Sequence, residues 1–200
     1  MFRKGEEARY LSHLDLMSTL EFSLRRARLP LELSEGFNPR PRMSLVAPLP
    51  LGYVGEREIL ELSLSEHFDL AEIASRLSAT VPTGITIGDV IEVAPEGKSA
   101  ASRLRSATYY VELAKPVGDL RARIYELLDR YSLEIEEERD GTLRKRDLRP
   151  AILDLKAVSA RAFVLVAGYD GGTVRPEQIL GLMGIDADGA RITRQSIEVA

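Results

Sequence analysis

An amphipathic stretch that stops at a proline constrains the fold of this chain more than any other sequence feature. Along residues 12–28, leucine and alanine recur at spacings of four, four and three, which puts them on one face of a helix. Ser12 can cap the start of this helix, with Asp15 three residues on in an acidic variant of the capping box. Pro30 cannot continue a helix. The sequence therefore predicts a helix over residues 12–28 with one buried stripe.

A proline-stiffened loop, Gly36-Phe37-Asn38-Pro39-Arg40-Pro41-Arg42, follows the predicted helix. Each proline drives the residue before it toward extended geometry. In an extended segment Arg40 and Arg42 point to the same side, where they could bind neighbouring phosphates. Phe37 could stack on a base and Asn38 could read an edge of it. The alternative is a rigid surface loop in which Phe37 plugs the core and Asn38 only shapes the turn.

His13 is one of two histidines and stands in the first turn of the predicted helix. Unpaired backbone N–H groups at that position disfavour a protonated imidazole. A neutral His13 could act as a base together with Asp15, or hydrogen-bond to a ribose or phosphate. In the simpler interpretation Ser12 and Asp15 cap the helix and His13 packs beside them. Both interpretations stay open, so His13 and Asp15 are the catalytic candidates and Ser12 joins them as a possible ligand residue.

Composition excludes several classes of site. The chain has 200 residues, a net charge of −4 and a pI of about 5.4, so any anion-binding surface must be a local patch. It has no cysteine, which removes disulfides, cysteine-ligated zinc, iron–sulfur clusters and thiol catalysis. No apolar run is long enough to cross a bilayer and no signal-peptide pattern is present. We therefore expect a cytoplasmic protein without a metal or other cofactor of its own.

The remaining pattern repeats one order of elements in each half. Hydrophobic periodicity predicts strands over residues 2–4, 8–11, 31–34, 43–47, 56–65, 85–93, 107–114, 133–139, 151–158, 162–168 and 191–199. Further helices are predicted over residues 69–79, 117–131 and 176–183, and a hairpin turn at Asp140-Gly141. Each half approximates strand-helix-strand-strand-helix-strand. The sequence predicts an α+β fold of two tandem ferredoxin-like units with antiparallel sheets, at residues 1–94 and 107–200, joined by a linker at 95–106.

A second basic run lies in the C-terminal half. It contains Lys145, Arg146 and Arg149, and Arg194 of the last predicted strand could extend it into an RNA-binding surface. The alternative is an ordinary solvated face. Arg191 and Arg194 are three residues apart and would face opposite sides of a regular strand, which argues against one continuous patch.

Several motifs together resemble one bacterial family along nearly the whole chain. They are Phe2-Arg3-Lys4-Gly5, Arg9-Tyr10-Leu11-Ser12-His13-Leu14-Asp15, the loop at residues 36–42, Pro48-Leu49-Pro50-Leu51-Gly52, Asp147-Leu148-Arg149-Pro150, Val174-Arg175-Pro176 and Arg191-Ile192-Thr193-Arg194. This set resembles the radical SAM-linked family. That family is a bacterial domain of unknown function, found alone or fused behind cobalamin-type radical S-adenosylmethionine proteins.

The resemblance implies partnership with a radical S-adenosylmethionine enzyme. This chain cannot be that enzyme, because it has no cysteines to bind the cluster. The family more often has histidine where Arg40 stands and lysine where Arg42 stands, so a cationic role is expected at position 40 in place of an acid–base role. The family's first strand is longer, so the native N-terminus is expected upstream of Met1.

We expect an accessory protein, not a stand-alone enzyme, that binds RNA where the helix start at residues 12–15 meets the loop at 36–42. Arg40 and Arg42 would hold phosphate, Phe37 would stack, and His13 and Asn38 would contact sugar or base. Tandem ferredoxin-like units occur in RNA-binding proteins, which is an analogy of fold. One alternative is a docking or substrate-delivery module for the radical enzyme. Another is a metal-free hydrolase or nuclease that uses His13.

Overall fold

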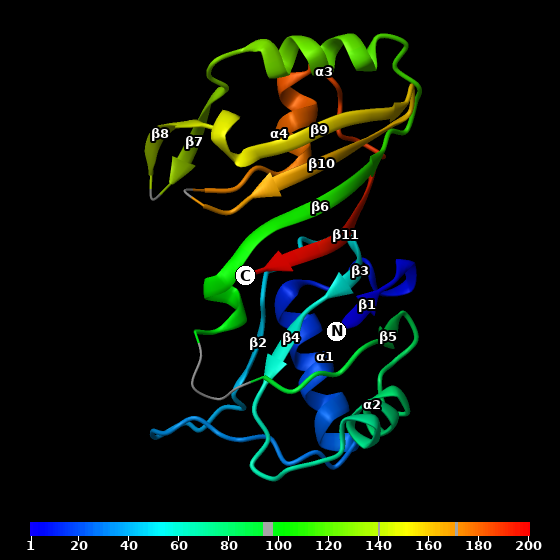
Figure 1. The fold of residues 1–200 in the computed structure, drawn as a ribbon, viewed down its shortest axis with the longest axis vertical. Coiled ribbons are helices and arrows are strands. Elements are labelled where there is room, and N and C mark those ends of the chain that lie inside the picture. Colours follow the sequence, from blue (N-terminus) through cyan, green and yellow to red (C-terminus); the bar gives the residue numbers. More distant parts are fainter. Residues whose placement is uncertain (94–97, 140, 171) are drawn as a thin grey trace. The chain divides into compact units, whose positions relative to one another are not determined.

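The computed structural model describes residues 1–93, 98–139, 141–170 and 172–200. In these residues the chain is an α+β protein with four α-helices and mostly antiparallel sheets (Figure 1). It divides into two compact units: unit 1 contains residues 1–104 and 199–200, and unit 2 contains residues 105–198. None of the described helices is long and apolar enough to cross a membrane.

Unit 1 is built on two helices and two small ladders. Its elements are β1 (Phe2–Lys4), α1 (His13–Arg26), β2 (Met43–Leu45), β3 (Val54–Glu58), β4 (Leu60–Leu62), α2 (Leu70–Ser78) and β5 (Ile85–Ile87), with 3-10 turns at Glu6–Ala8 and Ala100–Arg103. β1 lies between β5 and β3 and pairs antiparallel with both. β2 pairs antiparallel with β4 in a separate ladder.

The predicted stripe of α1 forms the core of unit 1. Leu16 and Leu20 pack with residues of β1, β2 and β5, among them Phe2, Leu45 and Ile85. Near the other end of α1, Leu24 packs in a second cluster with residues of α2. The helix therefore contacts one end of the unit through its first turns and the other end through its last turns.

Unit 2 carries the longer strands. Its elements are β6 (Leu104–Glu112), α3 (Leu120–Asp129), β7 (Glu134–Arg139), β8 (Thr142–Asp147), a 3-10 turn (Arg149–Ala151), β9 (Ile152–Ser159), β10 (Ala162–Gly168), α4 (Pro176–Leu182) and β11 (Arg191–Val199). The main sheet has the order β11-β6-β10-β9, and β7 and β8 form a separate hairpin. Burial alternates along β6, with Ala107, Tyr109 and Val111 facing the core.

The four predicted helices are confirmed, with ends within a few residues of the prediction. The side chains of Ser12 and Asp69 cap α1 and α2, because they accept hydrogen bonds from backbone N–H groups in the first turn of each helix. The finer prediction of two ferredoxin-like units is not confirmed, because in unit 1 the strand after α1 pairs outside the sheet that contains β1.

Several predicted strands are wrong or too long. Residues 8–11 form no strand: Ala8 ends the 3-10 turn, and a turn follows it. The Lys4 ammonium group donates hydrogen bonds to the Arg9 and Leu11 carbonyls in this segment. Residues 56–65 divide between β3 and β4, which belong to different ladders. Residues 31–34 contribute only isolated bridges, and residues 85–93 keep only β5.

The predicted linker and hairpin turn include residues outside the described part of the chain. β6 begins at Leu104, inside the predicted linker, and a 3-10 turn precedes it. Residues 94–97 of the linker are not described. A hairpin joins β7 and β8 at the predicted turn, although the sequence predicted no strand over residues 142–147. Of its two predicted turn residues, Asp140 lies outside the described residues and Gly141 has a φ of +73°, a conformation that favours glycine.

Candidate functional site

The start of α1 satisfies most of its own polar groups. Ser12 Oγ accepts a hydrogen bond from the Asp15 N–H at 3.2 Å and donates one to Asp15 Oδ2 at 2.7 Å. Asp15 therefore serves the cap, as the simpler interpretation expected. His13 is partly buried, and its Nδ1 atom has no hydrogen-bond partner among the described residues. A catalytic role for His13 remains a prediction, because Asp15, the carboxylate expected to act with it, is engaged in the cap.

The segment that meets the start of α1 is the second proline motif, residues 48–52. The Gly52 N–H donates to the Arg9 carbonyl at 2.9 Å. Fully buried Lys4 donates to the same carbonyl and to that of Leu11, both at 3.0 Å. The motifs at residues 2–5 and 48–52 thus have a structural role, which is to fix the chain that leads into α1. This role of Lys4 was not predicted, because nothing in the sequence around a lysine in a short strand indicates that it is buried.

The loop at residues 36–42 is the outer part of a hairpin, which we call the 32–42 hairpin. Ser34 donates its backbone N–H to the Arg40 carbonyl at 2.7 Å, and its Oγ accepts from the Arg40 N–H at 3.0 Å. Arg42 donates its N–H to the Glu32 carbonyl at 2.8 Å. Its side chain forms an ion pair with the Glu32 carboxylate at 3.1 Å. These four polar interactions join the two sides of the hairpin.

The tip of the 32–42 hairpin is exposed from Glu35 to Arg40. The ring of Phe37 is fully exposed, so the interpretation in which it plugs the core is wrong. Asn38 and Arg40 are also exposed. Gly36 has a φ of +124°, which explains why glycine stands at the turn. The structure therefore brings together four of the predicted ligand residues: Phe37, Asn38, Arg40 and Arg42.

His13 does not join this group. α1 has 14 residues, about 21 Å of helix at 1.5 Å per residue, and His13 is its first residue. The 32–42 hairpin follows the other end of α1 and connects to β2 through Met43, which packs between the two core clusters. The predicted shared pocket between the helix start and the loop is therefore wrong. The two motifs are close in sequence, but the whole of α1 separates them in space.

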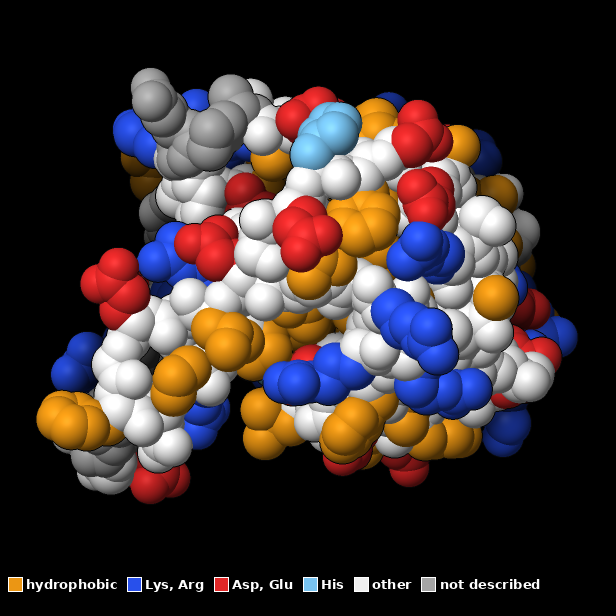
Figure 2. Space-filling model, turned by 90° about the horizontal axis from the view of Figure 1, so that it is seen from below, with side chains coloured by type: hydrophobic (Ala, Val, Ile, Leu, Met, Phe, Trp, Pro, Cys, Tyr) orange, Lys and Arg blue, Asp and Glu red, His pale blue; other side chains and the backbone are white. Residues whose placement is uncertain are grey.

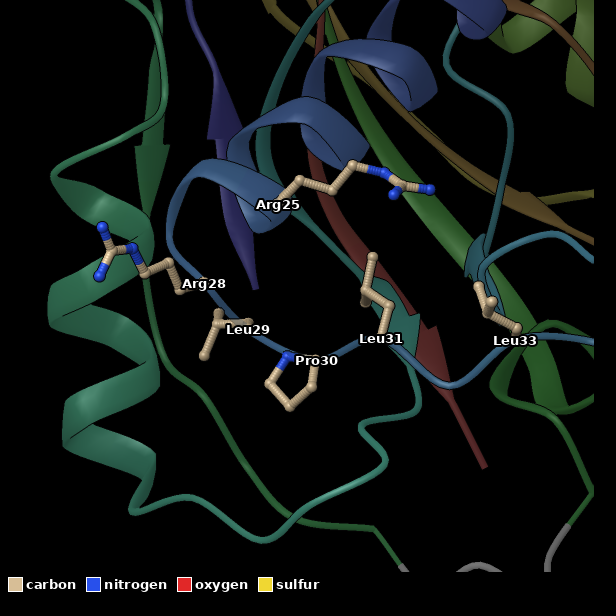
Figure 3. Close-up of a pocket in the computed structure, with 6 residues that line it drawn as sticks. All are labelled: Arg25, Arg28, Leu29, Pro30, Leu31 and Leu33. Carbon is tan, nitrogen blue, oxygen red and sulfur yellow. The ribbon is translucent and has the colours of Figure 1, made fainter.

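An open pocket lies instead at the end of α1. It measures about 430 Å³ and is lined by Arg25, Arg28, Leu29, Pro30, Leu31 and Leu33 (Figure 3). Leu33 belongs to the 32–42 hairpin, so the pocket and the hairpin adjoin. We call it the α1-end pocket. Nothing in the spacing of its two arginines in the sequence indicated a pocket.

The surface around this pocket is locally basic. Residues 25–42 contain five arginines and two glutamates, a net charge of +3 in a chain of net charge −4. Figure 2 shows Lys and Arg side chains gathered beside hydrophobic side chains on one face. No group of three or more His, Asp or Glu residues suited to a metal ion occurs in the part of the chain that the structure describes.

The second predicted basic run is neutralised by its neighbour. β8 carries Lys145 and Arg146, but β7 opposite it is acidic. Lys145 approaches Glu134 at 3.8 Å and Arg146 approaches Glu137 at 3.2 Å. Arg149 donates to the Leu128 carbonyl at 3.4 Å. These residues have intramolecular partners, so this run does not form the uniformly basic surface that the sequence suggested.

Arg194 is not at the surface. It is fully buried in β11, whereas Arg191 is exposed, so the two do face opposite sides of the strand as predicted. Arg194 hydrogen-bonds to the hydroxyl of Tyr109, and burial is the main cause that raises the pKa of that phenol. Arg194 therefore cannot extend a surface patch, and its predicted contact with RNA is excluded by burial.

Comparison with known proteins gives a family match. Residues 1–176 match the family described as an uncharacterized protein conserved in bacteria, DUF2344. No curated protein matches the chain. The matched segment includes α1, the α1-end pocket, the 32–42 hairpin and the β7–β8 hairpin, whereas most of α4 and all of β11 follow it.

Proposed function

We propose a function from the premise that this chain belongs to the bacterial DUF2344 family: it binds RNA through the 32–42 hairpin, as an accessory protein of a radical S-adenosylmethionine enzyme. The link to a radical enzyme comes from the resemblance of its motifs to the radical SAM-linked family. The RNA-binding part comes from the chemistry of the hairpin.

The fully exposed ring of Phe37, three residues from Arg40, is the observation that carries the proposal. An exposed aromatic ring can stack on any base, and neighbouring guanidinium groups can bind phosphate. Arg40 is exposed, and the exposed Arg42–Glu32 ion pair contributes little stability that a phosphate would have to replace. The Ser34–Arg40 hydrogen bonds hold the two strands of the hairpin in register, which limits the entropy lost on binding.

The strand order of unit 2 gives weaker support. The order β11-β6-β10-β9, with α3 after β6 and α4 after β10, is that of a ferredoxin-like unit into which the β7–β8 hairpin is inserted. We propose that unit 2 has this fold and that unit 1 is a variant with its second strand displaced. RNA-binding modules of this kind use their sheets, so the likeness supports the general class by analogy alone.

The test is the double variant Arg40→Ala with Arg42→Ala, measured by fluorescence anisotropy on a single-stranded RNA of mixed sequence. Each lost phosphate contact should reduce the slope of log K against log salt by about 0.7, so the double variant should lower it by about 1.4. Affinity should fall by roughly tenfold or more at low salt.

The matched control is Arg144→Ala with Lys145→Ala on β8, which removes the same charge from residues that face an acidic strand. It should leave the salt slope close to that of the wild type. Equal losses in the two double variants would mean that only net charge matters, and unchanged affinity in the hairpin variant would exclude the hairpin as the site.

A second candidate function is docking of the radical enzyme on the same hairpin. Leu33 and Phe37 are exposed apolar side chains beside arginines, a composition typical of protein interfaces. A co-purification in which RNase leaves a radical S-adenosylmethionine protein bound, and Phe37→Ala releases it, would favour docking over RNA binding.

A further inference from the structure

The α1-end pocket places an apolar floor between two arginines. Leu29, Pro30, Leu31 and Leu33 line the floor, and Figure 3 shows the side chains of Arg25 and Arg28 directed to opposite sides of it. A volume of about 430 Å³ falls in the range of small-molecule pockets, about 300–1,000 Å³. In this view Leu29, Pro30 and Leu31 lie between the two guanidinium groups, and Leu33 lies beyond that of Arg25.

Arg28 occupies a backbone position that normally selects glycine. Its φ is +54°, the only positive φ of a non-glycine residue in the described chain. The Leu29 N–H bonds to the Leu24 carbonyl and the Arg28 N–H to the Arg25 carbonyl, which is the Schellman pattern with Arg28 in the left-handed position. Glycine satisfies this geometry without steric strain. Arginine has this strained backbone conformation here, and its side chain lines the pocket.

The two arginines differ in how free they are. Arg25 is held by Glu21, with Nε and an Nη atom at 2.9 and 2.8 Å from the same carboxylate oxygen. Arg28 is exposed and forms no ion pair with the described residues. A negatively charged group that binds Arg28 would therefore meet no competing carboxylate, whereas one at Arg25 would share the guanidinium with Glu21.

We propose that the α1-end pocket holds one unpaired base of a single-stranded RNA, with the phosphates on either side of that nucleotide bound by Arg25 and Arg28. The inference rests on the proposed function and specifies its substrate class. The alternation of phosphate, base and phosphate along a single strand matches cation, apolar floor and cation in the pocket. A duplex conceals its bases in the stack and cannot offer one to this floor.

The experiment compares four proteins on three ligands. The proteins are wild type, Arg28→Gly, Arg26→Ala and the double variant Arg40→Ala with Arg42→Ala. The ligands are a short single-stranded RNA, its duplex, and the same strand with abasic sites that keep the phosphates and lack the bases. Arg28→Gly keeps the Schellman geometry, so loss of binding would not reflect misfolding. Arg26→Ala is the matched control, because Arg26 is an exposed arginine of the same turn that does not line the pocket.

The expected result has three parts. Wild type should prefer the single strand over both the duplex and the abasic strand by roughly tenfold. Arg28→Gly should lose about five- to tenfold in affinity for the single strand and less for the other two ligands, because without a base in the pocket their phosphates are not held beside Arg28. Arg26→Ala should stay within about twofold of wild type on all three, since its charge is not at the pocket.

Three outcomes would overturn the inference, and they separate it from the proposed function. If wild type binds single strand, duplex and abasic strand equally and the double variant still loses affinity, the hairpin binds RNA but the pocket holds no base. If Arg28→Gly and Arg26→Ala lose the same affinity, the pocket has no role beyond its charge. If wild type binds none of the three ligands, the proposed function and the inference both fail.

Discussion

The two hairpins of this protein both carry arginines and differ in what stands opposite them. In the 32–42 hairpin the exposed tip carries Phe37 and Arg40 with one glutamate, Glu35, beside them. In the β7–β8 hairpin, Arg144, Lys145 and Arg146 face a strand with four glutamates. The first hairpin therefore presents an aromatic ring and an arginine, Arg40, that forms no ion pair with the described residues, and the second presents charge that is already paired.

The difference shows that a run of basic residues becomes a binding surface only if its cross-strand neighbours leave it unpaired. In an antiparallel pair, residues directly opposite lie close enough for their charges to interact. β7 places Glu137 opposite Arg144 and Glu136 opposite Lys145. The ion pairs of Lys145 with Glu134 and of Arg146 with Glu137 are diagonal, two residues from the directly opposite position. The prolines of the 32–42 hairpin exclude a regular strand and so leave Arg40 without such a neighbour.

The largest effect is expected from removing the platform of the first hairpin. Leu24 is completely buried at the end of α1 and packs against Leu29 and Leu31, which line the α1-end pocket. Leu24→Ala should lower the free energy of unfolding by about 2–5 kcal/mol, because it leaves a cavity in the core. Urea denaturation followed by circular dichroism measures the change.

Leu14→Ala is the matched control, on the same helix but with 75% of the side chain exposed. It should change stability by less than about 0.5 kcal/mol. Similar losses of stability in the two variants would show that α1 stabilises the protein through helix formation and not through the packing of Leu24. The first hairpin would then have no packed platform to distinguish it from the second.

A smaller effect should follow from exposing the charges of the second hairpin. Glu134→Gln with Glu137→Gln removes the carboxylates that approach Lys145 and Arg146. RNA affinity measured by anisotropy should rise by about two- to fivefold at low salt, because freed cations attract phosphate. Glu126→Gln with Asp129→Asn, on α3, changes the net charge equally at exposed positions away from the hairpin. If both pairs raise affinity alike, pairing across the hairpin does not explain the contrast.

Much of the fold could be predicted because its signals are local. The stripe on α1 and the caps at Ser12 and Asp69 lie within one helix each, and sequence spacing reports them directly. Strand pairing is not local. The apparent strand at residues 56–65 divides into β3 and β4 because its two parts pair with different partners, and no feature of the segment itself indicates that.

The candidate site was predictable at the level of single residues but not of their grouping. Proline, glycine and arginine at residues 36–42 indicated an exposed, cationic loop, and the structure has one. The grouping with His13 failed because two motifs close in sequence stand at opposite ends of a rigid helix. Arg28 was overlooked because its importance comes from a backbone angle, and an arginine after a helix is otherwise ordinary.

The stability of the fold at the base of the second hairpin should depend on pH. Backbone N–H groups of Leu133 and then Arg149 hydrogen-bond to Asp147 Oδ1 and lower the pKa of that carboxyl below its ordinary 3.8. A lowered pKa in the folded state means that the charged form stabilises the fold above that ordinary value. This contribution is lost as the pH falls through the folded-state pKa.

Asp147→Asn should therefore destabilise the protein at neutral pH, and the difference from wild type should shrink below pH 3.8. Unfolding by urea at several pH values measures the difference, and the carboxyl carbon resonance of Asp147 in a pH titration reports its pKa directly. A resonance that titrates at or above the ordinary value would mean that these hydrogen bonds do not fasten the hairpin.

The smallest effect is expected from replacing Arg28, which should raise the stability of the fold and lower the affinity for RNA. Arg28→Gly should raise the free energy of unfolding by about 0.5–1 kcal/mol, because glycine adopts a φ of +54° without strain. Arg28→Ala removes the same side chain and keeps a Cβ in the left-handed position, so it should give no such gain. Thermal or urea unfolding of the two variants separates the backbone contribution from that of the side chain. A stabilised Arg28→Gly that binds single-stranded RNA less well would show that the end of α1 sacrifices stability to keep an arginine at the pocket, whereas equal stability in both variants would remove the reason to regard that residue as selected for binding.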